Sequence, residues 1–177
     1  MANPNPFLWW LPGAGDAGKP AASLPDVHDK PGHLIRRAQQ IAVAIFIEEC
    51  GEHDLTPVQY AALVAIRDNP GIDATRIAGM IAFDRTTISG VMERLESKGL
   101  TRRQANAADR RMKLVEITTA GKALLKAVEP KVERAQKRIL APLGEDEQAM
   151  LMGLLTKLVA LNNDASRAPK KAAEAAD

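Results

Sequence analysis

The feature that most constrains this chain is a change of hydrophobic period near Leu100. Before it, apolar residues recur every three or four positions, as in LTPVQYAALVAI and TTISGVMERL, which predicts helices. After it, LTRRQ (100–104) and MKLVEIT (112–118) are short runs typical of strands, and the seven residues ANAADRR connect them. The pattern therefore predicts short helices followed by a two-stranded hairpin with a long loop.

Capping residues mark where the helices before the hairpin begin and end. Thr56 followed by Pro57 predicts one helix start, and Asp73 and Asp84 predict two more. Gly99 is typical of the position just beyond a helix end. Two short helices followed by a hairpin form a winged helix-turn-helix, in which the second helix enters the DNA major groove. We therefore predict a mainly α fold with a small β-hairpin wing.

The helices nearest the two ends of the chain are more apolar than surface helices. The one after Pro31 is apolar on more than one face, and the last one, EDEQAMLMGLLTKLVALNND, is rich in Met, Leu and Val. Both patterns indicate burial against a second chain. A long helix from Thr118 contains Pro130, which we expect to kink or interrupt it. The predicted domains are a disordered arm (1–30), a dimerisation helix (31–54), a winged helix-turn-helix domain (55–118), C-terminal dimerisation helices (119–164) and a disordered tail (165–177).

Positive charge is concentrated in the region of the hairpin. Between Asp84 and Lys113 eight basic residues face four acidic ones, a local excess of +4, while the rest of the chain sums to −2. Such an excess favours a polyanionic partner at this place. A solvated charged face is the alternative that charge alone leaves open.

The helix that starts at Asp84 has side chains suited to reading DNA. Arg85 can donate two hydrogen bonds to a guanine, and threonine can contact a phosphate or a thymine methyl group. If ANAADRR forms the wing tip, Arg110 can enter the minor groove, with Asp109 orienting a guanidinium group. An ordinary polar hairpin loop is the alternative. The candidate DNA-binding residues are Thr75, Arg76, Arg85, Thr86, Thr87, Ser89, Gly90, Arg94, Arg110 and Arg111.

The run IAGMIAFDRTTISGVMERLESKGLTRRQANAADRRMKLVEITTAGKALL resembles the MarR family of bacterial transcriptional regulators. The resemblance extends over roughly residues 33–163 and is most specific in LESKGLTRR, DRR and LVEITTAGKALL. It implies a homodimer whose first and last helices interleave, with a wing arginine, here Arg110, in the minor groove. One departure is Ala82, where the family often has glycine. If that position needs a positive φ, the turn must differ locally.

A candidate effector site lies in the helix after Pro31. The segment HLIRRAQQ can place a histidine, an arginine and a glutamine on one side, and an arginine can clamp a carboxylate with two parallel bonds. Surface ion pairs and core positions for the aromatic residues are the alternatives. The resemblance implies a small aromatic anion as effector. HLIRRAQQIAVAIFIEECG further resembles the branch governing aromatic-acid breakdown, including regulators that respond to hydroxylated nicotinate. The candidate effector-binding residues are His33, Arg36, Arg37, Gln40, Phe46 and Tyr60.

Other function classes find little support in the sequence. No catalytic triad order, paired carboxylates, phosphate loop or Cys/His cluster occurs, so we predict no enzyme, no metal and no cofactor. An oxidant-sensing repressor would need a lowered pKa at Cys50, but Glu48 and Glu49 oppose that, and a buried apolar role is favoured. A helical adaptor that does not bind DNA would not need the basic face. With no signal peptide and no long apolar run, we expect a cytoplasmic protein.

Overall fold

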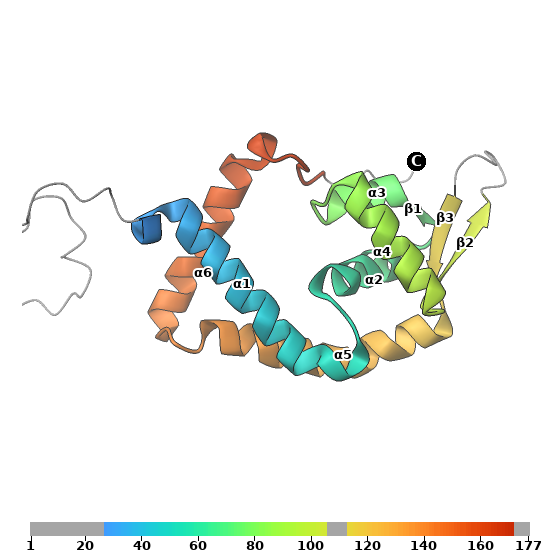
Figure 1. Cartoon of the computed structure of the whole chain (residues 1–177), viewed down its shortest axis with the longest axis horizontal. Helices are drawn as coiled ribbons and strands as arrows, with labels where there is room; N and C mark the ends of the chain where they lie inside the picture. Colours follow the sequence, from blue (N-terminus) through green and yellow to red (C-terminus); the bar gives the residue numbers. More distant parts are fainter. Residues whose placement is uncertain (1–26, 106–112, 172–177) are drawn as a thin grey trace, which may run out of the picture. The chain divides into compact units, whose positions relative to one another are not determined.

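The computed structural model describes residues 27–105 and 113–171, and residues 1–26, 106–112 and 172–177 lie outside the described part. It is mainly helical with one small sheet, as predicted (Figure 1). None of the helices in the described part is long and apolar enough to span a bilayer. The elements are η2 (Val27–Asp29), α1 (Pro31–Cys50), η3 (Gly51–His53), α2 (Pro57–Asp68), β1 (Ile72–Asp73), α3 (Ala74–Met80), α4 (Arg85–Ser97), β2 (Thr101–Ala105), β3 (Lys113–Ile117), α5 (Thr119–Leu140), α6 (Glu145–Leu161) and η4 (Asn163–Ala165).

The chain divides within α1 into two compact units, one ending at Ala38 and the other beginning at Gln39. In the first unit, the rings of His28 and His33 meet edge to face, with Nδ1 of the former 3.2 Å from Nε2 of the latter. The second unit contains the hydrophobic core and every element from the second half of α1 onward.

Local side-chain signals set the starts of α2 and α3. The Gln59 backbone N–H donates to Thr56 Oγ1 (3.3 Å) and the Thr56 N–H donates to Gln59 Oε1 (3.1 Å), which completes a capping box. At α3, the Asp73 carboxylate accepts bonds from the backbone N–H groups of Thr75 (2.7 Å) and Arg76 (3.0 Å). The predicted caps at both helices are confirmed.

The sheet has three antiparallel strands in the order β1-β3-β2. The β2–β3 hairpin is paired from Thr101↔Ile117 to Ala105↔Lys113, as the sequence predicted within one residue. The third strand, β1, pairs with β3 through Ile72↔Val115 and was not predicted. A strand of two residues has no alternating pattern, so only its pairing in the folded chain defines it.

A single apolar core joins the end of α1, α2, α3, α4, α5 and the sheet. Because this core contains residues of five helices, β1 and β3, it fixes which face of α4 points outward. Its largest fully buried side chains include Leu63, Ile66, Ile77, Ile88, Met92, Leu95, Val115, Leu125 and Val128.

Helix α5 continues through Pro130, so the predicted interruption there is wrong. Pro130 has no N–H for the carbonyl of Lys126, one turn earlier. Both residues are exposed, so water can bond that carbonyl. On the opposite face Leu125, Val128 and Val132 are buried in the core. Packing along the buried face therefore outweighs the local effect of proline.

Gly121 lies where α5 crosses the start of the hairpin, and we expect Gly121→Ala to destabilise the fold. A Cβ there would overlap the Leu100 carbonyl oxygen and lie 2.7 Å from Ile117 Cγ1. That carbonyl accepts a bond from the Thr118 N–H (3.0 Å), which restricts its movement. We expect a loss of about 1–3 kcal/mol, measured by urea unfolding. The control is Gly90→Ala, whose Cβ would have no neighbour within 4 Å. Equal stability of the two variants would contradict the close approach.

Candidate DNA-binding surface and effector residues

Asp84 fixes the start of α4 and therefore the position of the residues that follow. Its carboxylate accepts bonds from the Thr87 backbone N–H (2.9 Å) and the Thr87 hydroxyl (2.6 Å). These hydrogen bonds hold the pKa of the Asp84 carboxyl below its usual range. The N-terminus of α4 is thus ordered by its own residues, and the hydroxyl proton of Thr87 is already engaged.

Helix α4 is divided into an apolar face and a polar face. Ile88, Val91, Met92 and Leu95 are buried in the core. Arg85, Thr86, Thr87, Ser89 and Arg94 are exposed, and Gly90 is half-buried with open space around it. The Ser89 hydroxyl donates to the Arg85 carbonyl (3.0 Å). The outward face of α4 therefore presents arginine, threonine and serine around the first turn.

Three cations of the basic region, at the end of α4 and in β2, have acidic partners. Arg102 pairs with Glu116 across the hairpin (2.7 Å), and Arg103 pairs with Glu96 (3.2 Å). Lys98 likewise pairs with an acidic residue, Asp54 (2.8 Å). The first two pairs tie β2 to β3 and to α4, and the third ties the end of α4 to the segment before α2. Counting charges along the sequence could not reveal these roles.

Arg85 and Arg94 of α4 differ in their ion pairing from Lys98, Arg102 and Arg103. Among the described residues, neither Arg85 nor Arg94 has an ion-pair partner. An exposed guanidinium without an internal carboxylate keeps its donors for a ligand. Within α4, Arg85 and Arg94 are therefore the cations available to a polyanion.

The remaining DNA candidates lie in α3 or outside the described residues. Thr75 and Arg76 are exposed at the start of α3, where their backbone N–H groups bond the Asp73 cap. Arg110 and Arg111 fall outside the described residues, as does the wing tip as a whole.

The turn between α3 and α4 contains a left-handed alanine. Ala82 has a φ of 55°, so it adopts the conformation that glycine would allow without strain. From the sequence we expected the turn to differ locally if this position needed a positive φ. That expectation is wrong, because the alanine itself adopts the positive φ. The Phe83 N–H bonds the Ala78 carbonyl (3.0 Å) and closes the turn despite the Cβ.

We expect Ala82→Gly to raise the stability of the protein because it removes this backbone strain. The expected gain is roughly 1 kcal/mol, seen as a higher urea midpoint with an unchanged m-value. The matched control is Ala127→Gly in α5, an exposed helical position, where the same change should cost about 0.5–1 kcal/mol. A loss of stability at both positions would contradict the strain at Ala82.

The candidate effector residues fall into two groups. The first unit contains His33, Arg36 and Arg37. Arg36 Nη2 lies 3.4 Å from Nδ1 of the half-buried His33, and Arg37 is exposed. In the second unit Gln40 is exposed, whereas Phe46 is buried and contacts the half-buried Tyr60, with ring centroids 6.1 Å apart. Burial raises the pKa of the Tyr60 phenol. Phe46 belongs to the core and Tyr60 packs against it.

Cys50 lies at the end of α1 and is fully buried. Burial is the main cause that raises the pKa of its thiol. The neighbouring acids are partly neutralised, since Glu49 accepts bonds from Arg134 (3.1 Å) and Arg138 (2.8 Å) of α5 and Glu52 pairs with Lys131. A buried thiol with a raised pKa is a poor nucleophile. The geometry therefore gives the oxidant-sensing alternative no support.

A core-packed helix pair, a wing and the exposed arginines of α4 together define a winged-helix transcriptional regulator. The family model described as MarR family matches residues 55–113. The chain is also 33% identical to the HTH-type transcriptional repressor NicR of Pseudomonas putida, over 76% of this chain and 85% of the relative. This chain belongs to the MarR family of transcriptional regulators, which are not enzymes.

Solved structures agree with this assignment. BpsR of Bordetella bronchiseptica, described with regulation of its DNA binding by 6-hydroxynicotinic acid, matches with a TM-score of 0.72 and 32% identity, covering 77% of this chain and 97% of that one. A variant of MarR from Escherichia coli, complexed with operator DNA, matches with a TM-score of 0.68 and 29% identity, covering 72% and 92%. The relatives thus include proteins that bind DNA and one regulated by an aromatic acid.

Proposed function

We propose that this protein is a homodimeric repressor that binds a pseudo-palindromic operator and is released by a small aromatic carboxylate. The observation that carries the proposal is the outward face of α4, whose Arg85 and Arg94 have no ion-pair partner among the described residues. In this role the two copies of α4 occupy successive major grooves, about 34 Å apart. The wing residues Arg110 and Arg111 contact the adjacent minor groove and backbone.

Exposed apolar side chains support the dimer. In α1, Ile41 and Ile47 are each 49% exposed. In α6 no residue is buried, and Leu154 is 60% exposed. Contiguous apolar surface of this kind marks a protein interface. We assign residues 31–54 and 119–164 to the dimerisation region, with the exposed apolar faces of α1 and α6 as its contact surface, and residues 55–118 to DNA binding. The exposed large apolar residues of α6 are Met150, Met152, Leu154, Leu155, Leu158, Val159 and Leu161.

The effector class rests on the relatives and on the chemistry of α1. NicR is named a transcriptional repressor, and the DNA binding of BpsR is described as regulated by 6-hydroxynicotinic acid. Hydroxylated nicotinates are therefore the first effectors to test. Arg36 beside His33 offers a carboxylate clamp next to a ring nitrogen. The effector releases DNA only if it binds more tightly to the conformation that does not fit the operator than to the one that does.

The test is a gel-shift titration of the purified protein on the DNA upstream of its own gene. A panel of aromatic acids that includes 6-hydroxynicotinate and unsubstituted nicotinate is then added to the complex. We expect a specific shift that one of the acids reverses. If the purified protein binds this DNA no more tightly than random duplex at low salt, the repressor proposal is wrong.

We expect Arg36→Ala to keep operator affinity and to lose effector-driven release. Loss of a bidentate carboxylate contact costs about 1.5–3 kcal/mol, so roughly 10- to 100-fold more effector should be needed. Fluorescence anisotropy of labelled operator at increasing effector concentration measures this. Lys30→Ala, which removes an exposed cation from the same unit, is the control. Release of the Arg36 variant at the wild-type concentration would show that the clamp is wrong.

A further inference from the structure

The C-terminal end of α3 is completed by a residue from the far end of the chain. The carbonyls of Ile77 and Ala78 accept bonds from the N–H groups of Ile81 (3.1 Å) and Phe83 (3.0 Å) in the following turn. The carbonyl of Gly79 instead accepts a bond from the Lys171 N–H (2.9 Å). The last carbonyls of a helix need such partners from outside it. The segment after α6 therefore caps the first helix of the helix-turn-helix.

The contact between Lys171 and α3 is close because residue 79 is a glycine. A Cβ on Gly79 would lie 3.3 Å from Lys171 Cβ and 3.4 Å from its Cγ and Cδ. The aliphatic part of the lysine thus lies against the glycine. This packing holds the beginning of the side chain and leaves its ammonium group at the surface.

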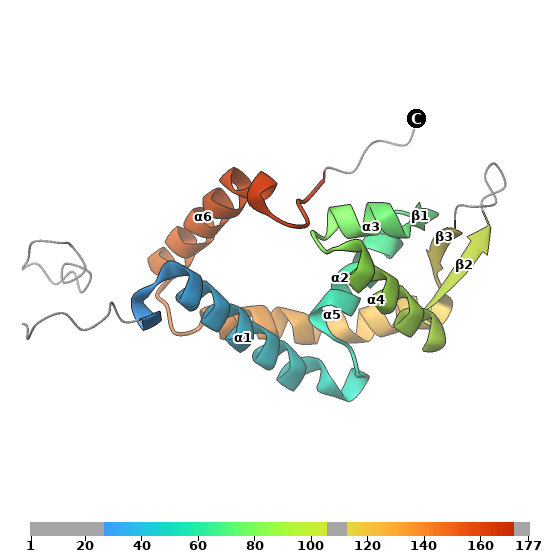
Figure 2. The ribbon, with the colours of Figure 1, turned by 45° about the horizontal axis from the view of Figure 1, so that its top comes forward.

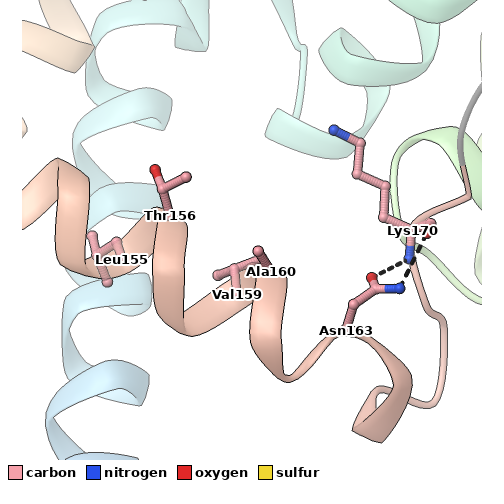
Figure 3. Close-up of a pocket in the computed structure, with 6 residues that line it drawn as sticks. All are labelled: Leu155, Thr156, Val159, Ala160, Asn163 and Lys170. Atoms are coloured by element: carbon pink, nitrogen blue, oxygen red, sulfur yellow. Dashed lines mark hydrogen bonds between the residues drawn. The ribbon is translucent and has the colours of Figure 1, made fainter.

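The same segment is held a second time by Asn163. Its Oδ1 accepts a bond from the Lys170 N–H (2.8 Å), and its Nδ2 donates to the Lys170 carbonyl (3.2 Å), as Figure 3 shows. Earlier in the segment the Ser166 hydroxyl accepts a bond from the Ala168 N–H (3.1 Å). The last two residues, Lys170 and Lys171, are therefore both held in place, and we call residues 166–171 the C-terminal strap.

The strap contains three cations and no acidic residue. Arg167, Lys170 and Lys171 are exposed, and none has an ion-pair partner within the described residues. The Lys170 side chain lines a groove of about 750 Å³ whose other lining residues include Leu155 and Val159 of α6 (Figure 3). That groove is part of the apolar face assigned to dimerisation. The other two cations, Arg167 and Lys171, remain for a separate partner.

The anchor of the strap lies beside the turn that leads into α4. Gly79 is in the last turn of α3, and only residues 81–84 separate α3 from α4. Figures 1 and 2 show the red segment after α6 ending next to this green turn. In a helix-turn-helix the start of the second helix faces DNA while the first helix crosses the backbone. With α4 in the major groove, as proposed above, the strap would lie near the DNA backbone.

We propose that the C-terminal strap is a second basic element of the DNA-binding surface, with Arg167 and Lys171 contacting operator phosphates. The inference rests on the proposed repressor function and adds a contact outside the winged helix-turn-helix. The strap also joins the end of α6 to the turn before α4.

The test compares Arg167→Ala/Lys171→Ala with wild-type protein in operator binding over a salt series. Both substitutions keep the backbone N–H that caps α3, so the fold should be retained, which circular dichroism and thermal unfolding check. Loss of two phosphate contacts in each subunit should make the slope of log K against log salt shallower by about 2 to 4. Affinity at low salt should fall at least about tenfold. The matched control is Lys126→Ala/Lys137→Ala, which removes the same charge from exposed positions of α5.

The salt slopes of the strap variant and of the control decide whether the strap contacts DNA. A shallower slope in the strap variant with a wild-type slope in the control supports the proposal. A strap variant whose slope equals that of the wild type, or of the control, overturns it while leaving the repressor function intact. If the wild-type protein itself does not bind its upstream DNA, the repressor function fails, and the strap contact fails with it.

Discussion

Leu154→Glu combined with Leu158→Glu is expected to convert the protein into a monomer and to weaken operator binding by more than about 100-fold. The two leucines are one helical turn apart in α6 and are 60% and 46% exposed in the single chain. Each buried leucine contributes about 1.5–3 kcal/mol, and a two-fold interface contains each position twice. The introduced carboxylates would also have to leave water in the interface. The loss of interface free energy, summed over both leucines in both subunits, should therefore be large enough to dissociate the dimer.

Loss of the dimer removes DNA affinity because each lobe reads only one half-site. A monomer gains one set of α4 contacts and loses the second set that dimerisation brings to the same duplex. Sedimentation or light scattering measures the mass, and anisotropy measures operator affinity in the same samples. The control is Ala127→Glu, which places a carboxylate on an exposed position of α5. A double variant that remains dimeric with native affinity would show that α6 is not the interface.

Arg85→Ala is expected to lower operator affinity by roughly 10- to 100-fold, since a bidentate arginine–guanine contact is worth about 1–3 kcal/mol. The side chain is exposed at the first position of α4 and makes no ion pair among the described residues, so its removal should not disturb the fold. The loss should be large on the operator and small on random duplex, because a base contact contributes only to the specific site.

Arg85→Lys separates base reading from simple attraction to phosphate. Lysine keeps the charge but lacks the planar pair of donors. Binding to random duplex should therefore stay near that of the wild type while operator affinity remains low. Competition titrations with operator and random DNA give both numbers. If Arg85→Ala loses affinity equally on both DNAs and Arg85→Lys binds both almost as well as the wild type, Arg85 is a phosphate contact and does not read a base.

The sequence by itself determined the helices, their starts and the hairpin. The side chains of Thr56, Asp73 and Asp84 act on backbone groups within three residues, so their effect is visible in a short window. The alternation in the hairpin and the three- to four-residue spacing in α4 are equally local. Family membership followed from the same stretch, because LESKGLTRR and LVEITTAGKALL contain both the fold signals and the resemblance.

The tertiary structure decided whatever depends on partners distant in the chain. Only packing shows that α5 passes through Pro130, because the helix is held by its buried face. The short strand β1 exists only through pairing with β3, and Ala82 keeps its left-handed turn because the core fixes both flanking helices. The pairing of Arg102 with Glu116, and the docking of Lys171 on Gly79 some ninety positions earlier, likewise leave no trace in sequence spacing. Local physics therefore specified the elements, and long-range contacts decided which charges remain available to DNA.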